Sequence, residues 1–273
     1  MKLGIVGKGG IGKTTISALL AETYAERGKR VLAVDTDSNP NLALNLGLDA
    51  ATADRVPLLP RSLVVGSGDG AITPADLLLE YGAQTSSGVT LLHAMRVTQA
   101  GAGCTCGSHA SVRSLLGAAI EEEADVTLVD MEAGLEHLSR SGGTLAYADI
   151  LLVIMEPSHK SVLTAARTLA LAEELGIPRV YGVGNKAHLP DDAEFFATVT
   201  AEYGVPLAHV VPYDPDVVEA DRLGTGLAPG RGRLVRAAVA ELVDFLESSD
   251  EERRALIQER DRIDRRLAEL TAD

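Results

Sequence analysis

The chain has 273 residues, of which 46% are hydrophobic and 3% aromatic, and this fits one large α/β domain with an aliphatic core. The formal net charge of −14 argues against a protein that grips nucleic acid, because affinity for a phosphate backbone rests on clustered lysine and arginine. No apolar run approaches eighteen residues and no charged-then-apolar leader comes first, so we expect a cytoplasmic protein without a membrane anchor.

The first expected strand covers residues 3–6 and the first expected helix residues 16–26, with a glycine-rich stretch between them. Residues 7–15 read Gly-Lys-Gly-Gly-Ile-Gly-Lys-Thr-Thr and match G-x-x-x-x-G-K-[ST] in the setting of strand before and helix after, which predicts a phosphate-binding loop. We expect Lys13 to supply the cation and Thr14 the hydroxyl ligand of Mg²⁺. The loop residues expected to bind ATP or ADP are Gly9, Gly10, Gly12, Lys13, Thr14 and Thr15.

A second lysine, Lys8, lies inside this loop. The run Lys-Gly-Gly-x-Gly-Lys-Thr-Thr resembles the deviant Walker A loop of the Min-system, chromosome-partitioning and nitrogenase iron protein ATPases. In those families the equivalent lysine reaches across a nucleotide-sandwich dimer to the phosphates of the partner. The resemblance therefore implies that Lys8 is catalytic and that the active form is a homodimer; the alternative is a solvated loop lysine.

The second buried strand is expected at residues 30–34 and runs into Asp35 and Asp37. Carboxylates at the C-terminal end of a parallel strand beside a phosphate loop lie where ligand chemistry takes place in such sheets. Asp37 aligns with the carboxylate that related ATPases use to orient or deprotonate the attacking water. We expect Asp35 to hold the loop or a Mg²⁺-bound water, and capping of the turn before Leu42 is the alternative.

Residues 49–74 are rich in proline, glycine and short polar residues, which predicts mostly a surface excursion with a short strand at 63–65. A short helix at 75–81 and a strand at 89–92 follow. Ser108 is then expected to cap a helix that runs to about residue 122.

A third parallel strand at 126–129 ends in Asp130, which fits a Walker B carboxylate that holds Mg²⁺ through water. Further strands are expected at 149–155, 180–184 and 207–211, with a helix at 160–175. Asn185 resembles the asparagine that hydrogen-bonds the adenine amino group in this superclass, and Pro212 should lie over the base. This alternation predicts a P-loop NTPase fold, α/β and doubly wound, whose mostly parallel sheet carries helices on both faces.

We expect residues 1–247 to form the ATPase domain and residues 248–273 a charged helical extension, as the second of two helical stretches past Arg231. Its charges are mixed rather than basic, which makes it a poor membrane anchor.

Cys104 and Cys106 lie in a glycine-flanked stretch before a helix, too close together for a comfortable mutual disulfide. The positive end of a helix dipole favours thiolates, and two thiolates are half of a tetrahedral zinc or nickel site. A two-fold dimer would bring four such sulfurs together. The alternatives are small buried cysteines, or a site within one chain completed by His109.

The loop, the Cys-Thr-Cys sequence and the run from Val129 to His137 together resemble the nickel-insertion accessory ATPases of carbon monoxide dehydrogenase. That family carries a Cys-x-Cys metal site and an Asp-x-Glu-Ala-Gly-x-Glu-His turn. The resemblance implies an ATPase of metallochaperone type that carries Ni²⁺ or Zn²⁺ to a client nickel enzyme. The runner-up is a Min-like or partitioning-like switch with structural cysteines. An iron–sulfur reductase is disfavoured, because no cysteine follows the strand at 126–129.

Overall fold

A central sheet organises the chain, and the computed structural model describes residues 1–60, 63–66, 69–96, 106–118, 120–132 and 145–271 of it. In this part the sheet has eight strands in the order β3-β4-β2-β5-β1-β6-β7-β8, parallel except for the antiparallel pair β3 and β4. The strands are β1 (Lys2–Val6), β2 (Val31–Asp35), β3 (Ala83–Gln84), β4 (Val89–His93), β5 (Val126–Asp130), β6 (Ile150–Met155), β7 (Val180–Ala187) and β8 (Leu207–Pro212).

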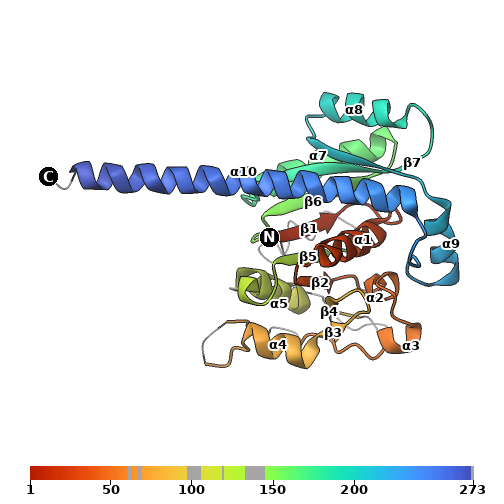
Figure 1. The fold of residues 1–273 in the computed structure, drawn as a ribbon, viewed down its shortest axis with the longest axis horizontal. Coiled ribbons are helices and arrows are strands. Elements are labelled where there is room, and N and C mark those ends of the chain that lie inside the picture. The colour runs from red at the N-terminus through yellow and green to blue at the C-terminus, as the bar shows by residue number, and fades with distance from the viewer. Residues whose placement is uncertain (61–62, 67–68, 97–105, 119, 133–144, 272–273) are drawn as a thin grey trace.

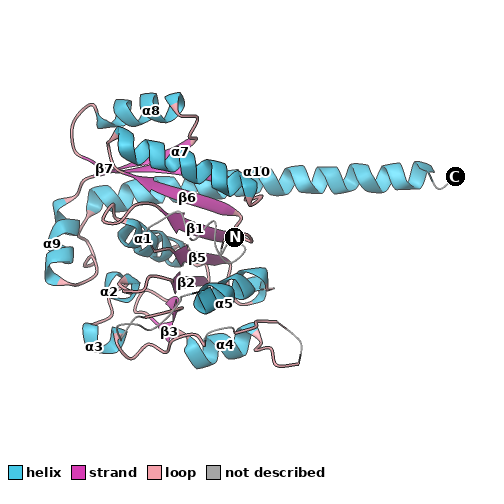
Figure 2. Cartoon of the chain, turned by 180° about the vertical axis from the view of Figure 1, so that it is seen from behind, coloured by secondary structure: helices cyan, strands magenta, loops and turns pink. Residues whose placement is uncertain are grey.

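Helices cover both faces of this sheet, because alternate strand residues point to opposite sides and both sets are apolar. In β6, Ile150, Leu152 and Ile154 pack on one face while Leu151 and Val153 pack on the other. The first face carries α1 (Lys13–Glu26), α2 (Leu42–Asn45) and α10 (Arg233–Thr271). The second carries α4 (Pro74–Tyr81), α5 (Cys106–Gly117), α7 (His159–Glu174) and α8 (Asp192–Glu202), with α5 and α7 toward the viewer in Figure 2.

The prediction of a doubly wound, mostly parallel α/β fold is confirmed, and each predicted parallel strand lies within a residue or a few of its place. β3 was not predicted, because its two residues pair with β4 through a tight turn and bury little apolar surface. The predicted strand at 63–65 is wrong: only an isolated bridge joins Val65 to Ile72. The segment 49–74, predicted as a surface excursion, also contains α3 (Ala50–Ala53), and its Val56 and Leu59 are buried in the core.

α10 corrects the expectation of two helical stretches past Arg231, since it is continuous across residue 247. Val235, Val239 and Leu242 bury its first half against α1 and β8. Figure 1 shows its second half projecting beyond the rest of the molecule. The division into a domain and an extension at 247 stays a prediction. Among the described residues, no helix is both long and apolar enough to cross a membrane.

Candidate nucleotide site

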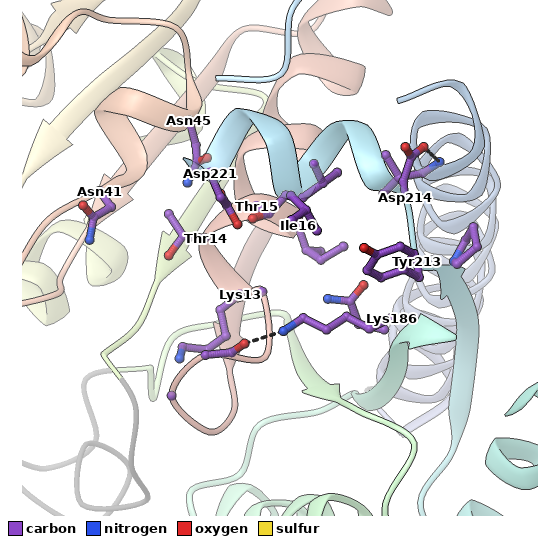
Figure 3. Close-up of a pocket in the computed structure, with 18 of the residues that line it drawn as sticks. Lys13, Thr14, Thr15, Ile16, Asn41, Asn45, Lys186, Tyr213, Asp214 and Asp221 are labelled. Carbon is purple, nitrogen blue, oxygen red and sulfur yellow. Dashed lines mark hydrogen bonds between the residues drawn. The ribbon is translucent and has the colours of Figure 1, made fainter. Parts of the chain in front are cut away.

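A pocket of about 490 Å³ opens at the C-terminal edge of the sheet, where the ends of β1, β2, β7 and β8 face α9 (Pro215–Leu223) (Figure 3). Ligands of open α/β sheets bind at this edge. The sequence-predicted residues that line the pocket are Gly9, Gly10, Gly12, Lys13, Thr14, Thr15, Asp37, Asn185 and Pro212. One cavity thus collects side chains from four separate parts of the sequence.

The glycine-rich loop approaches its neighbours so closely that side chains are excluded at particular positions. Gly12 has φ +91°, and a Cβ there would lie 2.5 Å from Nδ2 of Asn185. Gly7 has φ +145°, and its Cβ would lie 2.7 Å from the carbonyl oxygen of Ile154. α1 begins directly after Gly12, at Lys13, so the loop delivers the amides of a helix N-terminus to the pocket. That arrangement binds anions such as phosphate.

Lys13 is buried, with 7% of its surface exposed, and its ammonium donates to the carbonyl oxygen of Lys8 at 3.0 Å. Burial lowers the pKa of Lys13, and the negative charges of Asp130, Asp37 and Glu132 oppose this change. The lysine is therefore held against the loop, beside several carboxylates and at the rim of the cavity.

Asp130 ends β5 and is 2% exposed. The hydroxyl of Ser17 donates to Oδ1 of Asp130 at 3.0 Å, and the hydroxyl of Thr14 also donates to this carboxylate. Burial raises the pKa of Asp130 to about 6. Hydroxyl and carboxylate oxygens are the ligands that Mg²⁺ prefers, so this donor set fits the predicted magnesium site.

Asp35 is fully buried and lies beside Asp130 in the register of β2 and β5. One of its oxygens accepts the backbone N–H of Asp37 at 3.0 Å, and the other accepts that of Leu42 at 2.9 Å. Burial raises the pKa of Asp35 to about 7. Asp35 therefore holds the loop that follows β2, and a role through a Mg²⁺-bound water stays a prediction.

Asp37 itself lines the pocket, with Oδ1 accepting the backbone N–H of Asn39 at 2.8 Å. Its carboxylate thus has a defined orientation at the phosphate end of the cavity. This position suits a group that orients water, although the catalytic role stays a prediction.

Lys8 behaves differently from the other loop residues. Its ammonium donates to the carbonyl oxygen of Lys160 in the first turn of α7, at 3.1 Å, and this contact is exposed. Its side chain is not among those that line the pocket. Within one chain, the two loop lysines therefore point to different places.

The opposite end of the pocket is formed by residues at the C-terminal ends of β7 and β8. Asn185 donates from Nδ2 to the carbonyl oxygen of Ile11 at 2.7 Å, which leaves Oδ1 as the atom that can accept a hydrogen bond from a base. Pro212 lies at the end of β8, and Tyr213 follows with its backbone N–H bonded to Ala187 at 2.8 Å. The predicted base-binding residues are brought to one side of one cavity.

Sequence reasoning missed several lining residues, namely Asn41, Asn45, Lys186 and Asp221. Asn41 is the N-cap of α2 and Asn45 its last residue, and a helix of four residues gives no periodic pattern by which the sequence could have identified them. Lys186 directly follows the predicted Asn185, but its orientation depends on an unusual backbone that no motif announces.

The cysteine pair lies at the boundary of what the structure describes. α5 begins at Cys106, not after a cap at Ser108, so Cys106 stands in the first turn of the helix. Cys104 and His137 lie outside the described residues, as do the side chains of Cys106 and His109. In the described part of the chain, no three His, Cys, Asp or Glu side chains come together as a metal site.

Comparison with known proteins places this geometry among nucleotide-binding domains. Residues 5–227 match the family described as "CobQ/CobB/MinD/ParA nucleotide binding domain". The carbon monoxide dehydrogenase accessory protein CooC of Rhodospirillum rubrum is 34% identical over 89% of this chain and 97% of its own length. An uncharacterized ATP-binding protein of Methanocaldococcus jannaschii is also 34% identical, over 82% of this chain and 90% of its own.

Among solved structures, the MinD cell division protein of Aquifex aeolicus superimposes with a TM-score of 0.65. It is 19% identical, and the match covers 90% of this chain and 96% of that protein. At that level of identity the likeness concerns the fold.

Proposed function

Because this chain belongs to the CobQ/CobB/MinD/ParA family of nucleotide-binding domains, we propose that it is an ATP-hydrolysing maturation factor of metallochaperone type. It dimerises with ATP, binds nickel through Cys104 and Cys106, and delivers the metal to a client metalloenzyme. The observation that carries this proposal is the placement of Lys13, Thr14 and Asp37 around one pocket while Lys8 is directed elsewhere.

Hydrolysis needs a cradle for the phosphates and an oriented water. The loop amides and Lys13 bind the phosphates, and Asp37 orients the attacking water from the end of β2. Thr14, Ser17 and Asp130 provide the oxygens that would hold Mg²⁺, which neutralises charge on the phosphate oxygens. Asp35 positions Asp37, because its carboxylate accepts the backbone N–H of Asp37.

The proposal of a dimer rests on Lys8. In one chain its ammonium donates to the carbonyl oxygen of Lys160 outside the pocket, and this supports the proposal that a second copy supplies the charge implied by the deviant Walker A loop. In the two-fold dimer, each Lys8 reaches the phosphates held by its partner. Dimer formation then completes both catalytic centres together.

Nickel is the proposed cargo because the cysteine pair and the surrounding turns resemble the nickel-insertion accessory ATPases. Similarity to the accessory protein of carbon monoxide dehydrogenase suggests a client of that kind. Two cysteines per chain provide four thiolates per dimer, enough for a tetrahedral site for Ni²⁺ or Zn²⁺. Nucleotide and metal both favour the dimer, and this couples the binding of one to the binding of the other.

A series of variants separates these steps. Lys13→Ala should abolish binding of ATP, and Lys8→Ala should bind ATP with near-normal affinity yet lose turnover by about 10³-fold, the effect of removing an arginine-finger-type cation. Asp37→Ala should accumulate as a dimer with unhydrolysed ATP.

The Cys104→Ser/Cys106→Ser variant should lose metal and keep nucleotide binding. Retention of full metal stoichiometry in the double cysteine variant would contradict the proposed site.

The Min-like alternative predicts a different set of results. A switch that positions cargo should pellet with liposomes or DNA when ATP is present, and metal analysis of purified protein should find no thiol-dependent nickel or zinc. This alternative is worth testing because a septum site-determining protein is among the relatives, at 26% identity. Thiol-dependent metal without pelleting supports the maturation factor.

A further inference from the structure

Three side-chain donors hold carbonyl oxygens of the phosphate loop. Lys13 Nζ donates to Lys8 O at 3.0 Å, Asn185 Nδ2 to Ile11 O at 2.7 Å, and Lys186 Nζ to Gly10 O at 2.5 Å. Figure 3 shows the contact between Lys186 and the loop as a dashed line. Lys13 and Asn185 already have nucleotide-binding roles, whereas Lys186 has none.

A bond to a loop carbonyl also fixes an amide. In a planar trans peptide, the C=O of one residue and the N–H of the next point in opposite directions. The bond from Lys186 to the carbonyl of Gly10 therefore sets the direction of the N–H of Ile11. In the same way, the bond from Asn185 to the carbonyl of Ile11 sets the N–H of Gly12. These amides belong to the loop that should cradle the phosphates.

The backbone at Lys186 is unusual. Its φ is +59°, and among the described residues no other non-glycine residue has a positive φ. A left-handed conformation is unfavourable for a residue with a long side chain. The register of β7 against β8 shifts between Gly184 and Ala187, and such an irregularity re-aims a side chain. Here it directs the side chain of Lys186 toward Gly10.

We propose that Lys186 is a positioning residue for the phosphate loop, because its ammonium fixes the direction of the carbonyl of Gly10 and with it the direction of the amide of Ile11, which belongs to the cradle for the phosphates. This inference rests on the nucleotide binding proposed above. Lys186 lines the same pocket as the loop. Its effect on a ligand is exerted through the loop, so the effect should grow with the number of phosphates.

The alternative is that Lys186 acts only through its positive charge. Burial raises the pKa of Asp221 on α9, and the positive charge of Lys186 opposes that rise, so the two groups are near each other. Lys186 is exposed and could act only as a cation beside α9. In that case its effect on a ligand would be a through-space attraction that follows the charge of the ligand and that added salt screens.

The test compares ATP, ADP and AMP by calorimetric titration in the presence of Mg²⁺. Lys186→Met removes the ammonium and keeps an apolar stem; it should bind ATP and ADP about 10-fold more weakly, the effect of one charge-assisted hydrogen bond, with AMP changed by less than about 2-fold. Lys186→Arg keeps a cationic donor and should restore ATP affinity to within about 3-fold of the original chain. Lys29→Met removes a lysine beside Glu247, outside the pocket, and is the matched control.

Lys186→Gly separates the side chain from the backbone. Glycine accepts φ +59° without strain, so this variant should match Lys186→Met in nucleotide affinity while melting at a higher temperature. The inference is overturned if Lys186→Met binds ATP as tightly as the original chain, if AMP weakens as much as ATP, or if the loss of ATP affinity disappears when the titration is repeated at high salt. If the original chain itself fails to bind ATP, the proposed function fails first, and the two failures are thereby distinguished.

Discussion

His93, at the end of β4, has its imidazole fully buried, and neither ring nitrogen has a hydrogen-bond partner among the described residues. Burial, together with the nearby positive charge of Arg96, lowers the pKa of His93 to about 4. Burying an unpaired polar group costs free energy, so His93 destabilises the fold relative to an apolar side chain of similar size. The ring also favours the neutral form.

His93→Leu should therefore raise the free energy of unfolding at neutral pH by about 1–2 kcal/mol. In the original chain, the unfolded state gains a proton near pH 6.5 while the folded state gains it only near pH 4, so stability falls as the pH falls through this window. The fall attributable to His93 is about 3 kcal/mol at most and should be absent from the variant. Denaturant unfolding at several pH values measures both effects.

His188→Leu, at an exposed position, is the control for the replacement of a histidine by leucine. A loss of more than about 1 kcal/mol in His93→Leu at pH 7 would mean that a ring nitrogen has a partner that the variant has removed.

At the scale of elements, α10 shows where the packed part of the molecule ends. Asp250, near the middle of the helix, pairs with Arg179 at 2.8 Å, and Arg253 reaches Asp149 at 3.2 Å. These contacts lie beyond residue 247, the boundary that the sequence predicted. Figure 1 shows the helix beyond these contacts projecting away from the sheet.

A variant that ends at Glu247 should be less stable than one that ends at Arg254 by about 1–3 kcal/mol, because the shorter chain leaves the largely buried Arg179 without its carboxylate. The variant that ends at Arg254 should unfold close to the original chain. Denaturant titrations of the three proteins measure the difference. Equal stability of the two shortened chains would place the boundary at 247 after all.

The elements also show what sequence patterns could and could not predict. The phosphate loop and Asp130 were predictable because each depends on short-range order, a glycine motif after a strand and a carboxylate at a strand end. Asn41 and Asn45 were missed because they lie on and beside a four-residue helix, too short to show a period. The aim of Lys186 was missed because the register between β7 and β8 sets it, and a register is a long-range property.

At the scale of the whole molecule, the nucleotide pocket and the projecting second half of α10 lie at opposite edges of the sheet. The pocket is at the carboxyl ends of the strands, whereas Arg253 and Arg254 lie near the amino ends, beside Asp149 and Met1. Figure 1 shows the C-terminal end of α10 pointing away from the edge that carries α9, so we expect a dimer that joins two pockets to leave both helix ends outside its interface. The variant that ends at Arg254 should consequently dimerise with ATP as the original chain does.

The central claim is that two copies form one catalytic and metal-binding unit, and particle mass measures this most directly. Light scattering after anaerobic gel filtration should give the mass of one chain with ADP, and twice that mass with nickel and a non-hydrolysable ATP analogue. Metal analysis of the dimer fraction should find one nickel ion per two chains, lost in Cys104→Ser/Cys106→Ser. A particle that keeps the mass of one chain under saturating analogue and nickel would contradict the account.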